Sequence, residues 1–328
     1  MSVKIVVAGT GFPLLRSHLL EALPGASIVA ADPAALRADG ATGEVLIPTM
    51  SRIDGSLMDC IAGLRLIQQW GAGLEGVDVE AASRRGIAVA NVPTPGTGNA
   101  ESVAEWCVMA ALALSRRLAQ AERTIRSGTG WGIPMGQALL GRTAGILGLG
   151  GIGTALAQRL RPFGMRLVAV KRRPDPDLAE RLGLAWLGTL DELPVVLSQS
   201  DVLFLCMPVT EATHEIIDAT ALALLPRGAI LVNPARGGLV NELALVRALD
   251  EGRLGGAALD VFQHEPLLPG SPLLGRPDVL ATPHVAGVTD VSYRGIALRL
   301  AENARRAPAG GPYENCVNAD AIRAPRTR

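Results

Sequence analysis

The chain has 328 residues, of which 48% are hydrophobic and 19% are charged, and its formal net charge is zero. This composition excludes a disordered chain and predicts a globular protein of about two domains with sizeable cores. The balanced charge, without a long basic run, argues against nucleic acid or a membrane surface as a partner.

The four cysteines lie far apart and form no CxxC pair, which predicts free thiols and neither a zinc site nor a disulfide framework. The N-terminal run is too short for a signal sequence, and no uninterrupted apolar stretch reaches the roughly 18 residues of a membrane span. We therefore expect a cytoplasmic protein that binds no metal.

Short apolar runs alternate with helical patterns through the first third of the chain, which predicts a parallel sheet with helices on both faces. The expected strands are Lys4–Ala8, Ser27–Ala30, Val45–Ile47, Leu64–Gln68 and Ala88–Ala90, and the expected helices are Leu14–Leu23, Gly55–Ile61 and Val79–Arg85.

A loop rich in proline and glycine then leads into a predicted helix over Glu101–Leu118, with Asn99 as its N-cap. A polar excursion containing Trp131 follows, and a second alternation starts at Thr143. Its expected strands are Ala144–Leu149, Leu167–Val170, Val202–Cys206, Ile230–Val232, Gly256–Leu259 and Val279–Ala281, followed by a last helix over Val288–Arg306.

Two glycine-rich turns follow strands. Gly9-Thr10-Gly11 has Leu14 where a third glycine would stand, so we interpret it as a tight turn. The segment GLGGIG matches GxGxxG between a strand and an amphipathic helix, and so predicts a dinucleotide site whose pyrophosphate meets the helix N-terminus. The residues of that site are Gly148, Gly150, Gly151, Ile152 and Gly153.

Lys171, Arg172 and Arg173 end the next strand, where a chain that binds NAD usually carries an acid about 20 residues beyond the glycine motif. A carboxylate there accepts hydrogen bonds from the ribose hydroxyls and repels a 2′-phosphate. These cations cannot accept such bonds, but they can donate to a phosphate. The segment predicts a preference for NADP(H), and NAD(H) beside a solvated charge cluster is the alternative.

Three reactive side chains, Arg236, Glu265 and His284, each follow a predicted strand. Because the carboxyl ends of parallel strands meet at one edge of a sheet, we expect all three near the glycine motif. His264 adjoins Glu265, but neighbouring side chains point apart, so His264 is the poorer partner.

The motifs GLGGIG, NPARGGLVNELALVRAL, GAALDVFQHEPL and TPHVAG stand in the order and with the spacing of the D-isomer-specific 2-hydroxyacid dehydrogenase family, which this chain resembles over nearly its whole length. The resemblance implies two doubly wound α/β domains with parallel sheets. A flavodoxin-like substrate domain would take residues 1–98 and 285–328, and a Rossmann cofactor domain would take residues 99–284.

The resemblance also implies a mechanism. Arg236 would bind the carboxylate and carbonyl of a 2-oxo acid, and His284 would donate a proton to the developing alkoxide. Glu265 would orient His284 and favour its protonated form. Trp70, Gly71, Ala72 and Gly73 would contribute to substrate binding with Arg236 and His284. Further cofactor contacts would come from Met207, Pro208, Thr213, Pro234, Ala235, Asp260 and Gly287.

Departures from the family pattern narrow the function. Pro48-Thr49 stands where many relatives have an Arg-Ser pair. The loss of that cation, which could meet a substrate phosphate, makes phosphoglycerate a poorer substrate. Glu265 argues against a formate enzyme, which usually has glutamine at this position. A phosphite oxidiser and a dinucleotide-sensing corepressor stay as alternatives. We expect an NADPH-dependent reductase of glyoxylate, hydroxypyruvate or a similar small acid, dimeric through the cofactor domain around Leu118–Arg142.

Overall fold

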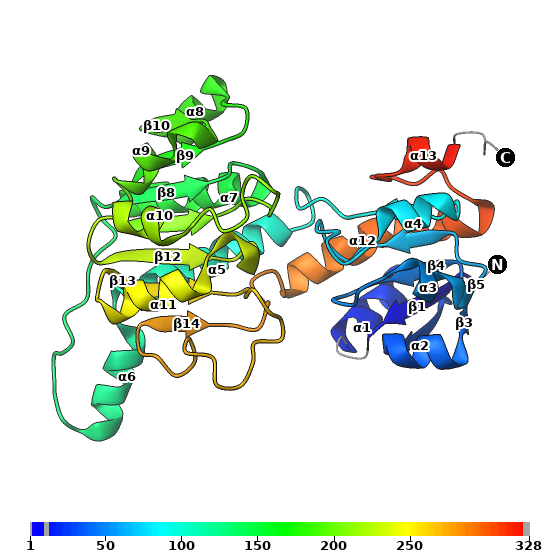
Figure 1. Cartoon of the computed structure of the whole chain (residues 1–328), viewed down its shortest axis with the longest axis horizontal. Helices are drawn as coiled ribbons and strands as arrows, with labels where there is room; N and C mark the ends of the chain where they lie inside the picture. Colours follow the sequence, from blue (N-terminus) through cyan, green and yellow to red (C-terminus); the bar gives the residue numbers. More distant parts are fainter. Residues whose placement is uncertain (1, 10–12, 324–328) are drawn as a thin grey trace. The chain divides into compact units, whose positions relative to one another are not determined.

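The computed structural model describes residues 2–9 and 13–323, and these divide into two compact units. Unit 1 consists of the described parts of Met1–Asn99 and Thr289–Arg328, and unit 2 is Ala100–Val288 (Figure 1). Both are α/β units built on parallel sheets, so the predicted fold class is confirmed.

Unit 1 has a five-stranded parallel sheet in the order β2-β1-β4-β6-β7 and a separate pair, β3 and β5. The strands are β1 (Lys4–Ala8), β2 (Ser27–Ala31), β3 (Ala41–Thr42), β4 (Val45–Ile47), β5 (Ile61–Ala62), β6 (Leu66–Gln68) and β7 (Ala88–Ala90). The helices are α1 (Pro13–Ala22), α2 (Pro33–Asp39), α3 (Gly55–Asp59), α4 (Val79–Arg84), α12 (Asp290–Arg306), η4 (Ala307–Ala309) and α13 (Ala319–Arg323).

Unit 2 has a seven-stranded parallel sheet in the order β10-β9-β8-β11-β12-β13-β14. Its strands are β8 (Thr143–Leu147), β9 (Arg166–Val170), β10 (Trp186–Gly188), β11 (Val202–Leu205), β12 (Ala229–Asn233), β13 (Leu254–Leu259) and β14 (Val279–Ala281). The order reverses between β8 and β11, and ligands of open α/β sheets bind at such a switch point.

The helices of unit 2 cover both faces of its sheet. They are α5 (Asn99–Ser115, which begins at the unit boundary), α6 (Leu118–Ser127), α7 (Gly151–Leu160), η1 (Arg161–Phe163), α8 (Pro176–Leu182), η2 (Leu190–Glu192), α9 (Leu193–Leu197), α10 (Ala219–Leu224), η3 (Gly237–Leu239) and α11 (Glu242–Asp250). Successive residues of a strand point to opposite faces of the sheet, and each face has its own hydrophobic core. Ile146 packs in the core on one face, and Leu147 packs in the core on the other.

The sequence-based boundaries need several corrections. The predicted helix over Glu101–Leu118 ends earlier, at Ser115 of α5, and the unpredicted helix α6 starts at Leu118, because Arg117 between them takes a left-handed conformation with φ 52°. Asn99 is the first residue of α5, and its side chain donates to Ser292 Oγ at 3.1 Å, so the predicted N-cap is wrong. The sequence interpretation also missed α2, the β3–β5 pair and the edge strand β10. In the predicted tight turn, Thr10 and Gly11 lie outside the described residues.

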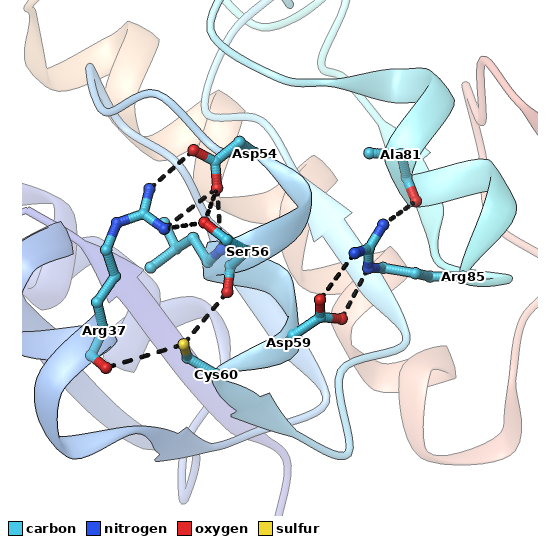
Figure 2. A network of polar contacts seen from close by, with 8 residues as sticks. Arg37, Asp54, Ser56, Asp59, Cys60, Ala81 and Arg85 are labelled. Atoms are coloured by element: carbon cyan, nitrogen blue, oxygen red, sulfur yellow. Dashed lines mark hydrogen bonds and ion pairs between the residues drawn. The ribbon is translucent and has the colours of Figure 1, made fainter.

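A polar network ties the short helices of unit 1 together (Figure 2). The carboxylate of Asp54 caps α3 by accepting from Leu57 N at 2.9 Å, and it pairs with Arg37 of α2 through Nη2 to Oδ2 at 2.9 Å. Arg85, just after α4, donates to both oxygens of Asp59 at 2.7 Å. Side-chain bonds therefore link α2, α3 and α4 where each helix is too short to be stable alone.

Replacing Asp54 by alanine should lower the free energy of unfolding by about 1–2 kcal/mol, mostly through the lost helix cap, because the ion pair is partly exposed. Arg37, Leu57 N and Ser56 hold the pKa of Asp54 below its usual value. Its contribution is therefore present above the ordinary aspartate pKa of about 3.9 and is lost as pH falls below it.

Urea unfolding at pH 7 and at pH 3 checks this prediction, with Asp39→Ala as the control because Asp39 is an exposed aspartate at the end of α2. The difference in the free energy of unfolding between the wild type and Asp54→Ala should be smaller at pH 3 than at pH 7. An equal gap at both pH values would contradict the role of the charged carboxylate.

Candidate active site

The glycine motif forms the turn between β8 and α7 in unit 2. Gly148 has φ 101°, a conformation that disfavours other residues, and a Cβ on Gly153 would overlap the carbonyl oxygen of Gly148. A Cβ on Gly150 would meet nothing within 4 Å. Helix α7 begins without a side-chain cap, so its first N–H groups remain available to an anion. The turn thus has the tight geometry and the open space that a pyrophosphate needs.

Lys171, Arg172 and Arg173 directly follow β9, and β9 is the neighbour of β8 in the sheet. The backbone of Lys171 continues the sheet by donating to Gly188 O at 2.9 Å, and Arg172 and Arg173 are exposed. Within residues 2–9 and 13–323, the side chains of these three residues have no acidic partner. The cluster is therefore positioned by the sheet, while its charge is not neutralised by the described protein.

Arg236 follows β12 and is half-buried. The side chain of Asn233 shapes its turn, because Oδ1 accepts from Ala235 N at 3.0 Å and Nδ2 donates to Arg236 O at 2.9 Å. The guanidinium donates from Nη1 to Ala235 O at 2.6 Å. An extended strand end followed by a side-chain-supported turn thus presents one arginine at the carboxyl edge of the sheet.

His284 and Glu265 form a hydrogen-bonded pair at the same edge. His284 Nδ1 lies 2.8 Å from Glu265 Oε2, with the imidazole 37% exposed and the carboxylate 24% exposed. The other carboxylate oxygen accepts from Phe262 N at 3.0 Å. Because a carboxylate only accepts, Nδ1 carries the proton, and Nε2 is left to face a ligand.

Asp260 holds the turn that carries His284. Its carboxylate is 1% exposed and accepts three bonds, from Thr282 Oγ1 at 2.6 Å, Val285 N at 2.8 Å and Ala286 N at 2.8 Å. Its carbonyl accepts from His284 N at 2.8 Å, and His284 has φ 56°, which is rare outside glycine. Residues 285–288 belong to unit 2 together with Asp260.

The two carboxylates differ in electrostatics. Burial raises the pKa of Asp260, although its hydrogen bonds and the nearby His284 oppose that shift. Burial also acts to raise the pKa of Glu265, but hydrogen bonds from His284 and Phe262 N and the charge of Arg236 outweigh it, so this pKa lies below its usual value. Glu265 is thus the carboxylate that stays ionised beside the imidazole.

Other predicted cofactor residues lie in loops of the same unit. Thr213 is buried, donates to Pro208 O at 2.9 Å and accepts from Thr210 N at 2.7 Å, which closes the loop after Met207. Pro234 and Ala235 belong to the Arg236 turn, and Gly287 follows the turn held by Asp260.

The predicted substrate loop belongs to unit 1. Its carbonyls are engaged, since Gly71 O accepts from Val92 N at 2.9 Å and Ala72 O accepts from Asn91 Nδ2 at 2.8 Å. Within the described part of the chain, the N–H groups of Gly71, Ala72 and Gly73 meet no acceptor. Trp70 packs edge-on against Tyr293 with ring centroids 5.2 Å apart.

The structure brings Arg236, Glu265 and His284 to consecutive strand ends of one sheet, as their spacing predicted. Sequence reasoning placed Asp260 only among the further cofactor contacts, and the hydrogen bonds of Asp260 to the His284 turn are visible only in three dimensions. It missed Glu215 and Gln263, whose side chains meet at 2.8 Å across 48 residues. No local pattern marks either residue.

In the ranges that the structure describes, no group of three or more histidine, cysteine or acidic residues could hold a metal ion. None of the described helices has the length and apolar character needed to cross a membrane. All four cysteines are free.

Comparisons with known proteins address the family directly. The profile of the D-isomer specific 2-hydroxyacid dehydrogenase NAD binding domain matches residues 108–286. Glyoxylate reductase from Aeropyrum pernix is 37% identical over 280 residues, which cover 83% of this chain and 82% of that protein. D-3-phosphoglycerate dehydrogenase from Archaeoglobus fulgidus is 33% identical over 280 residues, but the match spans only 52% of its length.

A solved structure agrees in fold. The NADPH-dependent glyoxylate/hydroxypyruvate reductase from Sinorhizobium meliloti, in complex with NADP and malonate, superposes with a TM-score of 0.80 at 31% identity, over 100% of both chains. With the matching domain, the relatives and the sheet order in agreement, this chain belongs to the D-isomer specific 2-hydroxyacid dehydrogenase family, whose enzymes act on CH–OH groups with a nicotinamide cofactor.

Proposed function

We propose that the protein is an NADPH-dependent reductase of small 2-oxo acids such as glyoxylate and hydroxypyruvate, with Arg236, Glu265 and His284 as its catalytic residues. The observation that carries the proposal is the 2.8 Å bond between His284 Nδ1 and Glu265 Oε2, on the sheet edge that also presents Arg236. The names of the relatives from Aeropyrum pernix and Sinorhizobium meliloti support this substrate class.

Each side chain has a distinct task in this proposal. Arg236 stays charged at any working pH, and its planar fork binds the substrate carboxylate and polarises the neighbouring carbonyl. His284 presents Nε2 to the carbonyl oxygen and donates the proton that the developing alkoxide needs. Glu265 fixes the ring through Nδ1 and stabilises the positive charge that the imidazole carries before it gives up that proton.

NADP(H) fits the turn after β8. When bound, its nicotinamide supplies the hydride. Gly148, Gly150 and Gly153 leave room for the pyrophosphate against the N-terminus of α7, a ten-residue helix without a side-chain cap. Lys171 and the two arginines after it would donate to a 2′-phosphate, because no acidic side chain in the described chain neutralises them. Met207, Pro208, Thr213, Pro234, Ala235, Asp260 and Gly287 would line the rest of the site.

The substrate loop of unit 1 fits a carboxylate. Gly71, Ala72 and Gly73 have successive N–H groups without acceptors in the described residues, and successive backbone N–H groups can bind an anion. In this proposal unit 1 is the substrate domain, with Trp70 as part of the pocket wall, and unit 2 is the cofactor domain. The expected cytoplasmic location stays a prediction.

We further propose that Leu118–Arg142 forms a dimer interface. Helix α6 has no buried residue. Trp131 is 90% exposed, Met135 86% and Leu140 75%. Large apolar side chains gathered on one segment mark a surface that another protein covers, and a second copy of the chain is the partner we infer.

Arg236→Ala and His284→Ala should each lower kcat/KM for glyoxylate by at least about 10³, since each removes substrate binding or proton transfer. Glu265→Gln should lower kcat by about 10–100-fold. Because the pKa of Glu265 is lowered, its carboxylate stays charged as pH falls to the ordinary glutamate value of about 4.3, and loss of activity through its protonation should lie below that pH.

Steady-state rates across pH, with circular dichroism to verify folding, test these roles. His264→Ala is the matched control, since this exposed histidine adjoins Glu265 and should keep wild-type rates. Wild-type turnover in Arg236→Ala or His284→Ala would refute the assignment, and a folded wild type that binds NADPH but reduces no 2-oxo acid would favour a cofactor-sensing protein.

Replacing Arg172 and Arg173 together by alanine should reduce kcat/KM with NADPH by about 10–100-fold, which corresponds to about 1.4–2.7 kcal/mol, the contribution of one hydrogen bond to a charged group. The kcat/KM with NADH should stay nearly unchanged. Arg181→Ala, an exposed arginine on α8, is the control. Equal efficiency of the wild type with NADH and NADPH would overturn the cofactor assignment.

Light scattering after size exclusion should give the wild type twice the mass of one chain. Replacing Trp131 and Met135 by serine should shift it to the monomer, because the exposed apolar surface would then lose its main contacts. Leu243→Ser is the control, as Leu243 is 71% exposed on α11, outside the segment. A monomeric wild type would remove the proposed interface.

A further inference from the structure

The loop that carries Arg236 lies directly against the loop that carries Glu265. A Cβ on Gly237 would overlap the carbonyl of Phe262 and crowd Gln263 N. No side chain fits at position 237, so the two loops meet backbone to backbone. The separation of Arg236 from Glu265 therefore depends on how this contact is held.

A set of four polar side chains holds it, which we call the Glu215 clamp: Glu215, Asn241, Glu242 and Gln263. Gln263 Nε2 donates to Glu215 Oε1 at 2.8 Å and to Val240 O at 3.0 Å. Asn241 Nδ2 donates to the other oxygen, Glu215 Oε2, at 3.0 Å. Gln263 N donates to Glu242 Oε1 at 2.7 Å. Both oxygens of Glu215 thus bind donors from the two loops.

The backbone around Glu215 is anchored without its carboxylate. Glu215 N donates to Gly238 O at 2.8 Å, and Ile217 forms a parallel bridge with Val240. Ile217 is fully buried. Removing the carboxylate should therefore break one of the two bonds of Gln263 Nε2, and the bond of Asn241 Nδ2, without unfolding the segment.

The clamp also extends to the loop after β11. Glu215 lies two residues beyond Thr213, whose hydroxyl closes that loop. Three loops at the sheet edge therefore share one carboxylate, and two of them carry Arg236 and Glu265.

We propose that Glu215 and Gln263 are positioning residues that set the Arg236 turn and the Glu265 turn at the spacing that catalysis requires. The inference rests on the proposed function of these turns. Partly exposed neutral or singly charged hydrogen bonds add little to overall stability, whereas small misplacements of reacting groups cost large factors in rate. The clamp should matter more for turnover than for folding.

Steady-state kinetics of Glu215→Ala, Gln263→Ala and the double variant test the proposal in the full chain, with glyoxylate and NADPH. Each single variant should lower kcat about 5–30-fold and leave the KM for NADPH and the melting temperature nearly unchanged. Because the two side chains share the bond between Gln263 Nε2 and Glu215 Oε1, the loss of kcat in the double variant should be smaller than the product of the two single losses. Multiplied losses, or unchanged kcat in either single variant, would overturn the proposal.

Two further variants sharpen the result. Glu215→Gln can keep the bond from Gln263 but places an amide N–H₂ near Asn241 Nδ2, so its kcat should lie between wild type and Glu215→Ala. Glu211→Ala is the matched control, an exposed glutamate in the same loop. A loss in Glu211→Ala as large as in Glu215→Ala would show a general loop effect and contradict the clamp.

Arg236→Ala and His284→Ala, measured in the same assay, separate the two proposals. If both abolish turnover while the clamp variants do not affect it, only the positioning role fails. If either keeps wild-type turnover, the proposed catalytic function fails.

Discussion

The hydrogen bonds of the buried Asp260 carboxylate are the interactions on which the His284 turn of the candidate site depends. This carboxylate is 1% exposed, and the cost of burying it is offset by donors from Thr282, Val285 and Ala286. All three donors belong to the turn that contains His284. The same hydrogen bonds that compensate the buried Asp260 carboxylate therefore also fix this turn. The left-handed backbone of His284 persists because its neighbours are held on both sides.

The parallel sheet supplies the rest of the arrangement. β12, β13 and β14 are neighbours in the sheet, and they end beside one another in the residues that precede Arg236, Glu265 and His284. The glycine turn ends β8, on the other side of β11. Three reactive side chains and the glycine turn, from four strand ends, are thus gathered by topology, and local hydrogen bonds need only orient them.

The sequence predicted what local chemistry determines. Short apolar runs placed the predicted strands within two residues at each end, although β3, β5 and β10 were missed. The motifs around Arg236, Glu265 and His284 identified the turns that follow their strands. The break at Arg117 escaped, because no glycine or proline marks the left-handed residue between α5 and α6. The Glu215 clamp escaped as well, since the pairing of Glu215 with Gln263 depends on how two distant loops pack and leaves no periodic signal.

Gly237 has a consequence for how such an enzyme can change its substrate. Because no side chain fits between the Arg236 loop and the loop of Phe262, neither loop can be remodelled without moving the other. Under the proposed function, chemistry and selectivity are separated in the chain: the sheet edge of unit 2 would serve any 2-oxo acid, while the preference for a particular acid would fall to loops such as Trp70–Gly73. Evolution or engineering could then exchange the acid that is recognised while the proposed proton donor stays in place.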